Sequence, residues 1–149
     1  MSEHFKAFSA IFPFVFRTRD EKTEILLHRR QNTGYQDGKW DIAASGHVDE
    51  GETAKSAVIR ECKEELGIDV KAEDLTFAFL SHRLSERTYY DIYFAVNKYV
   101  GMPGIMEVEK CSELKWFDID DLPIDMIECR RAAVQAYKNN DYYNEIVDT

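Results

Sequence analysis

The sequence predicts a mixed α/β domain in which a sheet and helices pack in layers. Apolar, aromatic-rich segments of strand length come first, a stretch with helical periodicity follows, and the same alternation then repeats. The 149 residues, of which 44% are hydrophobic and 32% charged, are enough for one domain with its own core. No repeat, low-complexity segment or linker interrupts the chain, so we expect a single domain over residues 1–149.

The N-terminal part predicts a β-hairpin followed by a loop. Residues 6–17 (KAFSAIFPFVFR) are apolar and aromatic and predict a strand. Pro13 within it indicates an edge position or a bulge, because proline cannot donate a ladder hydrogen bond. Residues 23–29 (TEILLHR) are expected to pair with this strand across a turn at residues 19–22. The polar, glycine-containing residues 31–39 then predict a loop.

A short strand and an amphipathic helix are expected next. Residues 40–44 predict the strand, and Thr53 is a plausible N-cap for a helix over residues 54–66 with Gly67 as its C-cap. Apolar residues recur every four positions on this helix and are expected to face the core: Val58, Cys62 and Leu66.

The C-terminal half predicts three more strands and a closing helix. Residues 75–82 and 88–97 are apolar enough for strands, and the imperfect alternation of the second is typical of burial on both faces. Residues 113–118 (ELKWFD) predict a further short strand. Helical periodicity over residues 129–138 predicts the second helix.

Charge and composition exclude several classes of protein. A net charge of -9 argues against a nucleic-acid polymer as partner, although a bound divalent cation would still allow a single nucleotide. No apolar run approaches the roughly 20 residues of a membrane span, and the first ten residues do not read as a secretory signal. Three cysteines without metal-type spacing favour reduced thiols, so we expect a cytoplasmic protein.

A cluster of carboxylates on the first predicted helix is the strongest chemical signal. At about 100° per residue, Glu61, Glu64 and Glu65 lie within roughly 100° of one another on one face. Like charges at this spacing repel each other, and a bound cation relieves the repulsion. Hard oxygen ligands suit Mg²⁺, with Mn²⁺ as an alternative. The other interpretation is an exposed acidic helix with an Arg60–Glu64 salt bridge.

The segment GHVDEGETAKSAVIRECKEELGI resembles the signature of the Nudix hydrolases, G-x5-E-x7-R-E-U-x-E-E-x-G-U, in which U is a bulky aliphatic residue. The matching positions are Gly46, Glu52, Arg60, Glu61, Glu64, Glu65, Gly67 and Ile68. Cys62 departs from the first U but packs as a small hydrophobe. The resemblance implies an α/β/α sandwich with a mixed sheet and a loop-helix-loop catalytic motif. It also implies Mg²⁺-dependent cleavage of a diphosphate linkage in a nucleoside di- or triphosphate derivative, an oxidised nucleoside triphosphate included.

The same resemblance assigns roles within the motif. Glu61, Glu64 and Glu65 would be metal ligands, with the backbone carbonyl of Ser45 as a further ligand. Arg60 would pair with a motif glutamate and hold its rotamer. The network would include Glu52, as an outer residue or an occasional ligand. Which carboxylate activates the attacking water stays open.

Members of this family add a distal carboxylate from a later loop. The loop GMPGIMEVEKCSEL offers Glu107, Glu109 and Glu113, and we expect Glu107 to act, with Glu109 as the second choice. The alternative is that all three only solvate the loop.

Candidate substrate-binding residues lie outside the helix. Arg29 and Arg30 end a strand and are expected to place one side chain near substrate phosphate. The aromatic side chains of Tyr35 and Trp40 would stack on a base, although aromatics at strand positions more often belong to the core. Further candidates are His47 for phosphate, Asp118 for a base edge and His82 as an acid or base.

Two other functions are weighed against hydrolysis. Isopentenyl diphosphate isomerase shares the fold, and WDIAASGHVDEGE is similar to its neighbourhood, but that enzyme uses a cysteine ahead of the Gly-His pair, which is absent here. A non-catalytic sensing domain would usually lose motif carboxylates, and this chain retains all of them. In every case the expected partner is a nucleotide or another organic diphosphate, bound by a monomer or homodimer.

Overall fold

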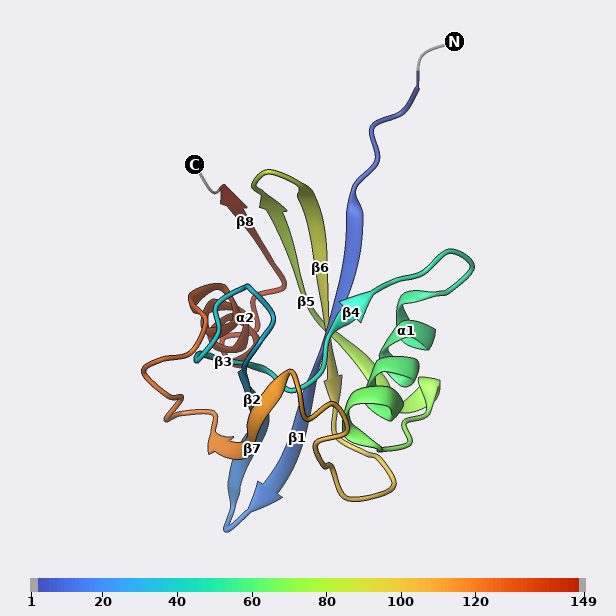
Figure 1. Ribbon diagram of the computed structural model, residues 1–149. Coiled ribbons are helices and arrows are strands. Elements are labelled where there is room, and N and C mark those ends of the chain that lie inside the picture. The colour runs from blue at the N-terminus through green and yellow to red at the C-terminus, as the bar shows by residue number, and fades with distance from the viewer. Residues whose placement is uncertain (1–2, 148–149) are drawn as a thin grey trace.

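The computed structural model describes residues 3–147, and its elements alternate as the sequence predicts. Figure 1 shows the arrangement, and the elements are β1 (Phe8–Arg19), β2 (Lys22–Arg30), β3 (Trp40–Ile42), β4 (Gly46–His47), α1 (Ala54–Glu61), η1 (Cys62–Leu66), η2 (Ala72–Asp74), β5 (Leu75–Leu84), β6 (Thr88–Val96), β7 (Cys111–Asp118), α2 (Glu128–Lys138) and β8 (Tyr143–Val147). No helix within residues 3–147 is long and apolar enough to cross a membrane.

The described strands form one eight-stranded mixed sheet. Its main order is β3-β2-β1-β6-β5-β8, while β4 pairs with β1 and β7 with β2. Strand β1 pairs in parallel with β6 and in antiparallel fashion with β2 and β4. The predicted hairpin is confirmed, and Asp20 and Glu21 make its tight turn with φ of 51° and 63°.

Pro13 lies neither on an edge strand nor at a bulge, the two positions that the sequence predicts for it. β1 is an interior strand, and Pro13 pairs with Phe94 of β6 without a break in register. On the other side of β1, pairing with β4 ends at Ile11 and pairing with β2 starts at Phe16. Pro13 lies in this interval, where the strand needs no donor on its second side, so its missing N–H is tolerated.

The helices cover opposite faces of the sheet, and each lies over its own core. Ala57, Val58, Cys62 and Leu66 pack on one face together with Ile11 of β1. On the other face, Ala133 and Val134 of α2 pack against aromatic residues that include Phe14, Phe79 and Tyr93. The two layers of helix around one sheet confirm the α/β/α sandwich (Figure 1).

The first helix begins as predicted and ends in a wider turn than expected. The Thr53 side chain caps it, and a reciprocal bond with Ser56 completes a capping box. The α-helix ends at Glu61, and Cys62–Leu66 continue as a π-helix. Gly67 closes it in the left-handed conformation, with φ of 70°.

Three short elements escape sequence-based prediction. Strand β4 has only two residues, and η2 has three. Strand β8 lies in a segment with exposed Tyr143 and Val147, and its pairing with distant β5 creates it. Such elements depend on tertiary pairing, since they are too short for a periodic pattern.

The buried stripe of α1 and η1 gives a stability prediction. Leu66→Ala should lower the free energy of unfolding by about 2–5 kcal/mol, because Leu66 is 2% exposed and its loss leaves a cavity. Leu84→Ala is the matched control, since Leu84 is 40% exposed and should cost less than about 1 kcal/mol. Urea denaturation measures both, and equal losses would contradict the packing described here.

Candidate active site

Arg60, in the last turn of α1, organises the motif carboxylates. Its Nε and Nη2 donate to the two carboxylate oxygens of Glu52 at 2.8 and 3.0 Å, a bidentate pair. Its Nη1 donates to Glu61 and, at 3.4 Å, to Glu64. Its Nη2 also donates to the carbonyl oxygen of His47 at 3.1 Å. The hydrogen bonds from Arg60 lower the pKa of Glu52 to about 2, so this carboxylate stays ionised.

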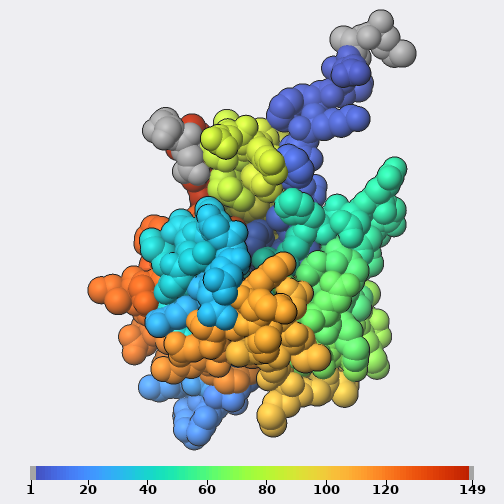
Figure 2. Space-filling model, in the orientation of Figure 1, coloured from blue at the N-terminus to red at the C-terminus, as the bar shows by residue number. Residues whose placement is uncertain are grey.

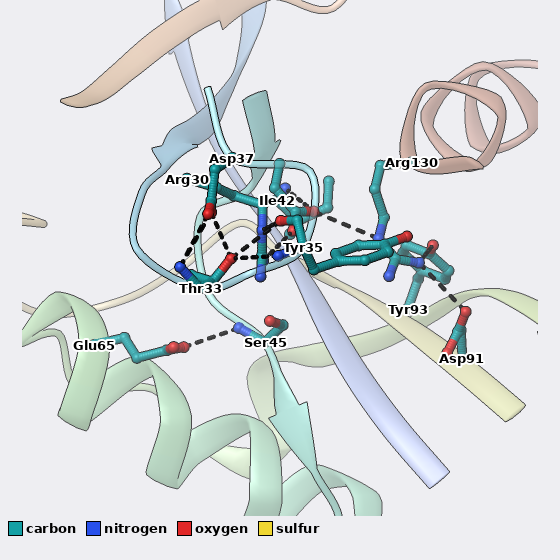
Figure 3. A network of polar contacts seen from close by, with 11 residues as sticks. Arg30, Thr33, Tyr35, Asp37, Ile42, Ser45, Glu65, Asp91, Tyr93 and Arg130 are labelled. Carbon is teal, nitrogen blue, oxygen red and sulfur yellow. Dashed lines mark hydrogen bonds and ion pairs between the residues drawn. The ribbon is translucent and has the colours of Figure 1, made fainter. Parts of the chain in front are cut away.

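Glu61 and Glu65 bring two carboxylates against the Ser45–Gly46 backbone. The Ser45 N–H donates to Glu65 Oε2 at 2.8 Å (Figure 3). A Cβ on Gly46 would lie 2.4 Å from Glu61 Oε1, so only glycine allows this approach. Burial and the charges of Glu61 and Glu107 raise the pKa of Glu65 to about 8. Burial also raises the pKa of Glu61, despite Arg60.

These carboxylates suit a divalent cation, and the remaining donors lie at the rim. Two buried, mutually repelling carboxylates are stabilised by a cation between them, and their oxygens are hard ligands. Glu64 is half-exposed, and Glu107 lines a polar pocket of about 300 Å³ together with Glu65 and Ser45. In residues 3–147 no three His, Cys, Asp or Glu side chains are already grouped to hold a metal ion. Glu64 and Glu107 are the nearby carboxylates that would complete a ligand set with Glu61 and Glu65.

A pocket of about 300 Å³, which we call the main pocket, opens beside the carboxylates. Figure 2 shows the hollow between the loop of residues 31–39, the β5–β6 hairpin and the β4 segment, with β1 at its base. Its lining residues are Ala10, Phe12, Arg30, Tyr35, Asp41, Ser45, Gly46, His47, Arg83, Tyr89 and Arg130. Ser45 and Gly46 line the pocket and also contact the carboxylates, so the pocket and the carboxylate site adjoin.

Three of the residues expected to bind substrate line this pocket: Arg30, Tyr35 and His47. Arg30 donates to Asp41 at 2.9 Å and to the Tyr35 carbonyl oxygen at 2.7 Å, which fixes the loop to the end of β2. Asp37 accepts from the Thr33 hydroxyl at 2.6 Å and closes the loop on itself. The ring of His47 packs near the Tyr89 ring at 6.0 Å.

The other expected binding residues lie elsewhere. Trp40 is 3% exposed in the core, where its ring meets Phe117 edge-on at 4.9 Å. Arg29 lies over the outer face of Trp40 and pairs with Asp125 at 3.2 Å. Asp118 caps the turn after β7 by accepting from the Asp120 N–H at 2.8 Å. These three are not among the pocket-lining residues, so their positions lend no support to a binding role.

The remaining candidates are also engaged away from the pocket. His82 stacks on Tyr90 at 4.5 Å. Glu113 pairs with Arg29 at 3.4 Å, and the Glu109 carbonyl oxygen accepts from Asn32. The charge of Glu107 is among the causes that raise the pKa of Glu61 and Glu65.

The polar floor of the pocket is the part that sequence reasoning missed. Arg130 of α2 donates through Nη1 to the Tyr93 hydroxyl at 2.8 Å and to Asp91 Oδ2 at 3.3 Å (Figure 3). Arg83 donates to the same Asp91 oxygen at 3.0 Å. Asp41 lies 3.4 Å from Arg130 Nε. The available signal was a charged residue inside an apolar strand, as Asp91 is in YYDIYF.

Comparison with known proteins finds relatives whose names describe diphosphatases. The chain is 44% identical to dihydroneopterin triphosphate diphosphatase of Escherichia coli over 62 residues. These residues cover 42% of this chain and 38% of that protein. It is 25% identical over 120 residues to a putative 8-oxo-dGTP diphosphatase of Bacillus subtilis, covering 80% of this chain and 74% of that one. The chain thus spans under two fifths of the length of the E. coli relative.

Solved structures and family membership agree with the fold. A MutT NUDIX hydrolase from Burkholderia pseudomallei superposes with a TM-score of 0.75 at 25% identity, over 88% of this chain and 98% of that one. Residues 11–137 match the NUDIX domain family. The match includes the motif glutamates, the Arg60 network and most of the pocket lining, and the chain therefore belongs to the NUDIX domain family.

Proposed function

We propose that the protein is a Mg²⁺-dependent pyrophosphohydrolase that splits a diphosphate linkage in a nucleoside triphosphate or a similar compound. The observation that carries the proposal is the contact of Glu61 and Glu65 with the Ser45–Gly46 backbone, which also forms one wall of the pocket. A diphosphate bound there would join an organic group in the pocket to phosphates at the carboxylates.

The residues of the chain then have separate tasks. Glu61, Glu64 and Glu65, with the Ser45 carbonyl, would hold the cation, which when bound neutralises phosphate charge and lowers the pKa of a water. Arg60 favours the ionised form of Glu61 against the effect of burial and orients it, since its guanidinium contacts Glu52 and Glu61 together. Mn²⁺ is the alternative ion for the same oxygen ligands.

The distal side of the site is assigned to Glu107 and Arg30. Glu107 lies on the loop that borders Glu65, and it would complete the ligand set or accept a proton from water. Arg30 lines both the main pocket and the neighbouring pocket at Glu107, so its cationic side chain would contact substrate phosphate.

The named relatives support a triphosphate substrate. One is a dihydroneopterin triphosphate diphosphatase and another a putative 8-oxo-dGTP diphosphatase, and in both names the group cleaved is a triphosphate on a heterocyclic compound. A cytoplasmic location and a monomeric or homodimeric state stay predictions from the sequence.

The isomerase alternative is disfavoured by where the thiols lie. Within the described residues, Cys62 is buried at the start of η1, and neither Cys111 nor Cys129 lines the main pocket. A non-catalytic sensor would keep the pocket but would not turn over a diphosphate.

A release assay tests the proposal. The purified protein with Mg²⁺ is offered nucleoside triphosphates, dihydroneopterin triphosphate, dinucleoside polyphosphates, nucleotide sugars and ADP-ribose, and phosphate and pyrophosphate release are measured. Pyrophosphate release from a triphosphate is expected. Absence of turnover across the panel by a folded, Mg²⁺-binding protein would overturn the hydrolase and favour the sensor.

Removing charge from the carboxylate site should abolish turnover without unfolding the chain. Glu65→Gln and Glu64→Gln should each lower kcat by about 10²-fold or more, because the variants lose charge but hardly change shape. Glu107→Gln should cost less, and Glu109→Gln serves as the matched control on the same loop. Near-normal kcat for Glu65→Gln would contradict the assignment of Glu65 as a metal ligand. Equal kcat for Glu107→Gln and Glu109→Gln would contradict the assignment of Glu107 as the distal carboxylate.

The raised pKa of Glu65 predicts pH-dependent stability of the metal-free protein. Its folded value of about 8 exceeds the ordinary 4.5, so the folded state holds this proton more tightly than the unfolded chain. The stabilisation is complete below about pH 4.5 and is lost as the pH rises through about 8. We expect the Tm in EDTA to fall between about pH 5 and pH 8.5.

Added Mg²⁺ should raise the Tm most at the upper end of that range, because it binds the ionised carboxylates. Glu65→Gln is the control, and its Tm should depend less on pH. Glu52, whose pKa is lowered, titrates below this range. A wild-type Tm with the same pH dependence as the Gln variant would contradict the assignment.

A further inference from the structure

The base of the main pocket holds more guanidinium groups than carboxylates. Arg30, Arg83 and Arg130 line or border it, and two carboxylates compensate them. Asp91 bridges Arg83 and Arg130, at 3.0 and 3.3 Å. Asp41 bridges Arg30 and Arg130, at 2.9 and 3.4 Å. Three positive charges against two negative ones leave one positive charge for a ligand to meet.

Arg130 is the deepest of the three, and its hydrogen bonding is incomplete. Its side chain is only 6% exposed, yet it is a lining residue of the pocket. The Nε lies within ion-pair distance of Asp41, but the geometry is not that of a hydrogen bond, and this buried atom has no hydrogen-bond partner among the described residues. An unsatisfied buried donor costs free energy that a ligand acceptor can recover.

The walls beside these cations are aromatic. The Arg30 guanidinium lies over the Tyr35 ring at 5.3 Å, Arg83 over Tyr89 at 4.3 Å and Arg130 over Phe12 at 3.8 Å. Figure 3 shows the Tyr35 side chain reaching from its loop toward Arg130. Flat rings and flat guanidinium groups together suit a flat ligand.

We propose that Arg130 selects substrates whose organic group is a planar heterocycle with an exocyclic carbonyl oxygen at its inner edge. A guanidinium only donates hydrogen bonds, so it complements a carbonyl oxygen and opposes an amino group at the same position. This inference rests on the proposed function, because it takes the diphosphate to lie at the carboxylates and the heterocycle in the pocket.

Two pairs of triphosphates test the carbonyl-for-amino exchange, and in both pairs the adjacent ring nitrogen changes with it from N–H to an acceptor. ITP and ATP differ at position 6 of a purine, and UTP and CTP differ at position 4 of a pyrimidine. With Mg²⁺ and the wild-type protein, kcat/KM should favour the oxo member of the better-accepted pair by about tenfold or more, the usual scale of arginine discrimination between base edges. Equal values, or a preference for the amino member, would overturn the proposal.

Arg130→Lys tests the residue itself. Lysine keeps the charge beside Asp91 but loses the planar fork, so the preference for the oxo member should shrink toward unity through KM, with kcat little changed. Arg131→Lys is the matched control, because Arg131 contacts Pro123 and Glu128 outside the pocket. An oxo preference that survives Arg130→Lys in a folded protein would remove the assignment to Arg130.

Product binding separates this inference from the proposed function. Calorimetric titration of the wild-type protein with IMP, AMP, UMP and CMP requires no turnover, and it also decides the case if Arg130→Lys does not fold. Tighter binding of the oxo nucleotide without any hydrolysis would support the carbonyl preference and contradict the hydrolase. Hydrolysis of both members of each pair with equal product affinities would leave the hydrolase standing and overturn the carbonyl preference.

Discussion

The bidentate pair between Arg60 and Glu52 is the interaction on which the site depends. It joins the loop after β4 to the last turn of α1, and the same guanidinium reaches Glu61 and the His47 carbonyl oxygen. Without Arg60, Glu61 and Glu64 would lose their ion pairs with its guanidinium, and the loop would lose its anchor on the helix. Glu52 therefore acts through Arg60, even though its own carboxylate lies outside the buried pair.

The two ends of the site call for opposite kinds of ligand group, a cation at one end and a hydrogen-bond acceptor at the other. At the carboxylate end, burial raises the pKa of Glu61 and Glu65, which creates a demand for a cation. At the other end of the pocket, buried guanidinium groups outnumber their carboxylates. A molecule with an acceptor-bearing organic group and a metal-bound diphosphate would meet both demands, whereas either half alone would meet only one. The proposed ligand therefore has two chemically different parts.

Local spacing made one half of this site predictable. The capping residue Thr53, the buried stripe through Cys62 and the carboxylate face all follow from positions three or four apart on one helix. The structure adds a π-helix after Glu61, and no residue type along that segment predicts it.

The pocket floor was not predictable in the same way. Asp41, Asp91 and Arg130 come from β3, β6 and α2, and only the pairing of distant strands brings them together. Trp40 shows the converse problem. An aromatic residue just before a motif is equally consistent with stacking on a base and with a position in the core. Here its burial against Phe117 places it in the core.

The parallel pairing of β1 with β6 also bears on how the chain folds. Phe8 pairs with Tyr89, so β1 and β6 can pair only after two segments more than half the chain apart have come together. Closing so long a loop costs entropy before any contact repays it, and folding rates fall as the sequence separation of contacts grows. The β1–β2 hairpin and the α1 helix can form early from local contacts. The pocket, whose base is β1 and whose wall includes Tyr89, exists only after the slow long-range step.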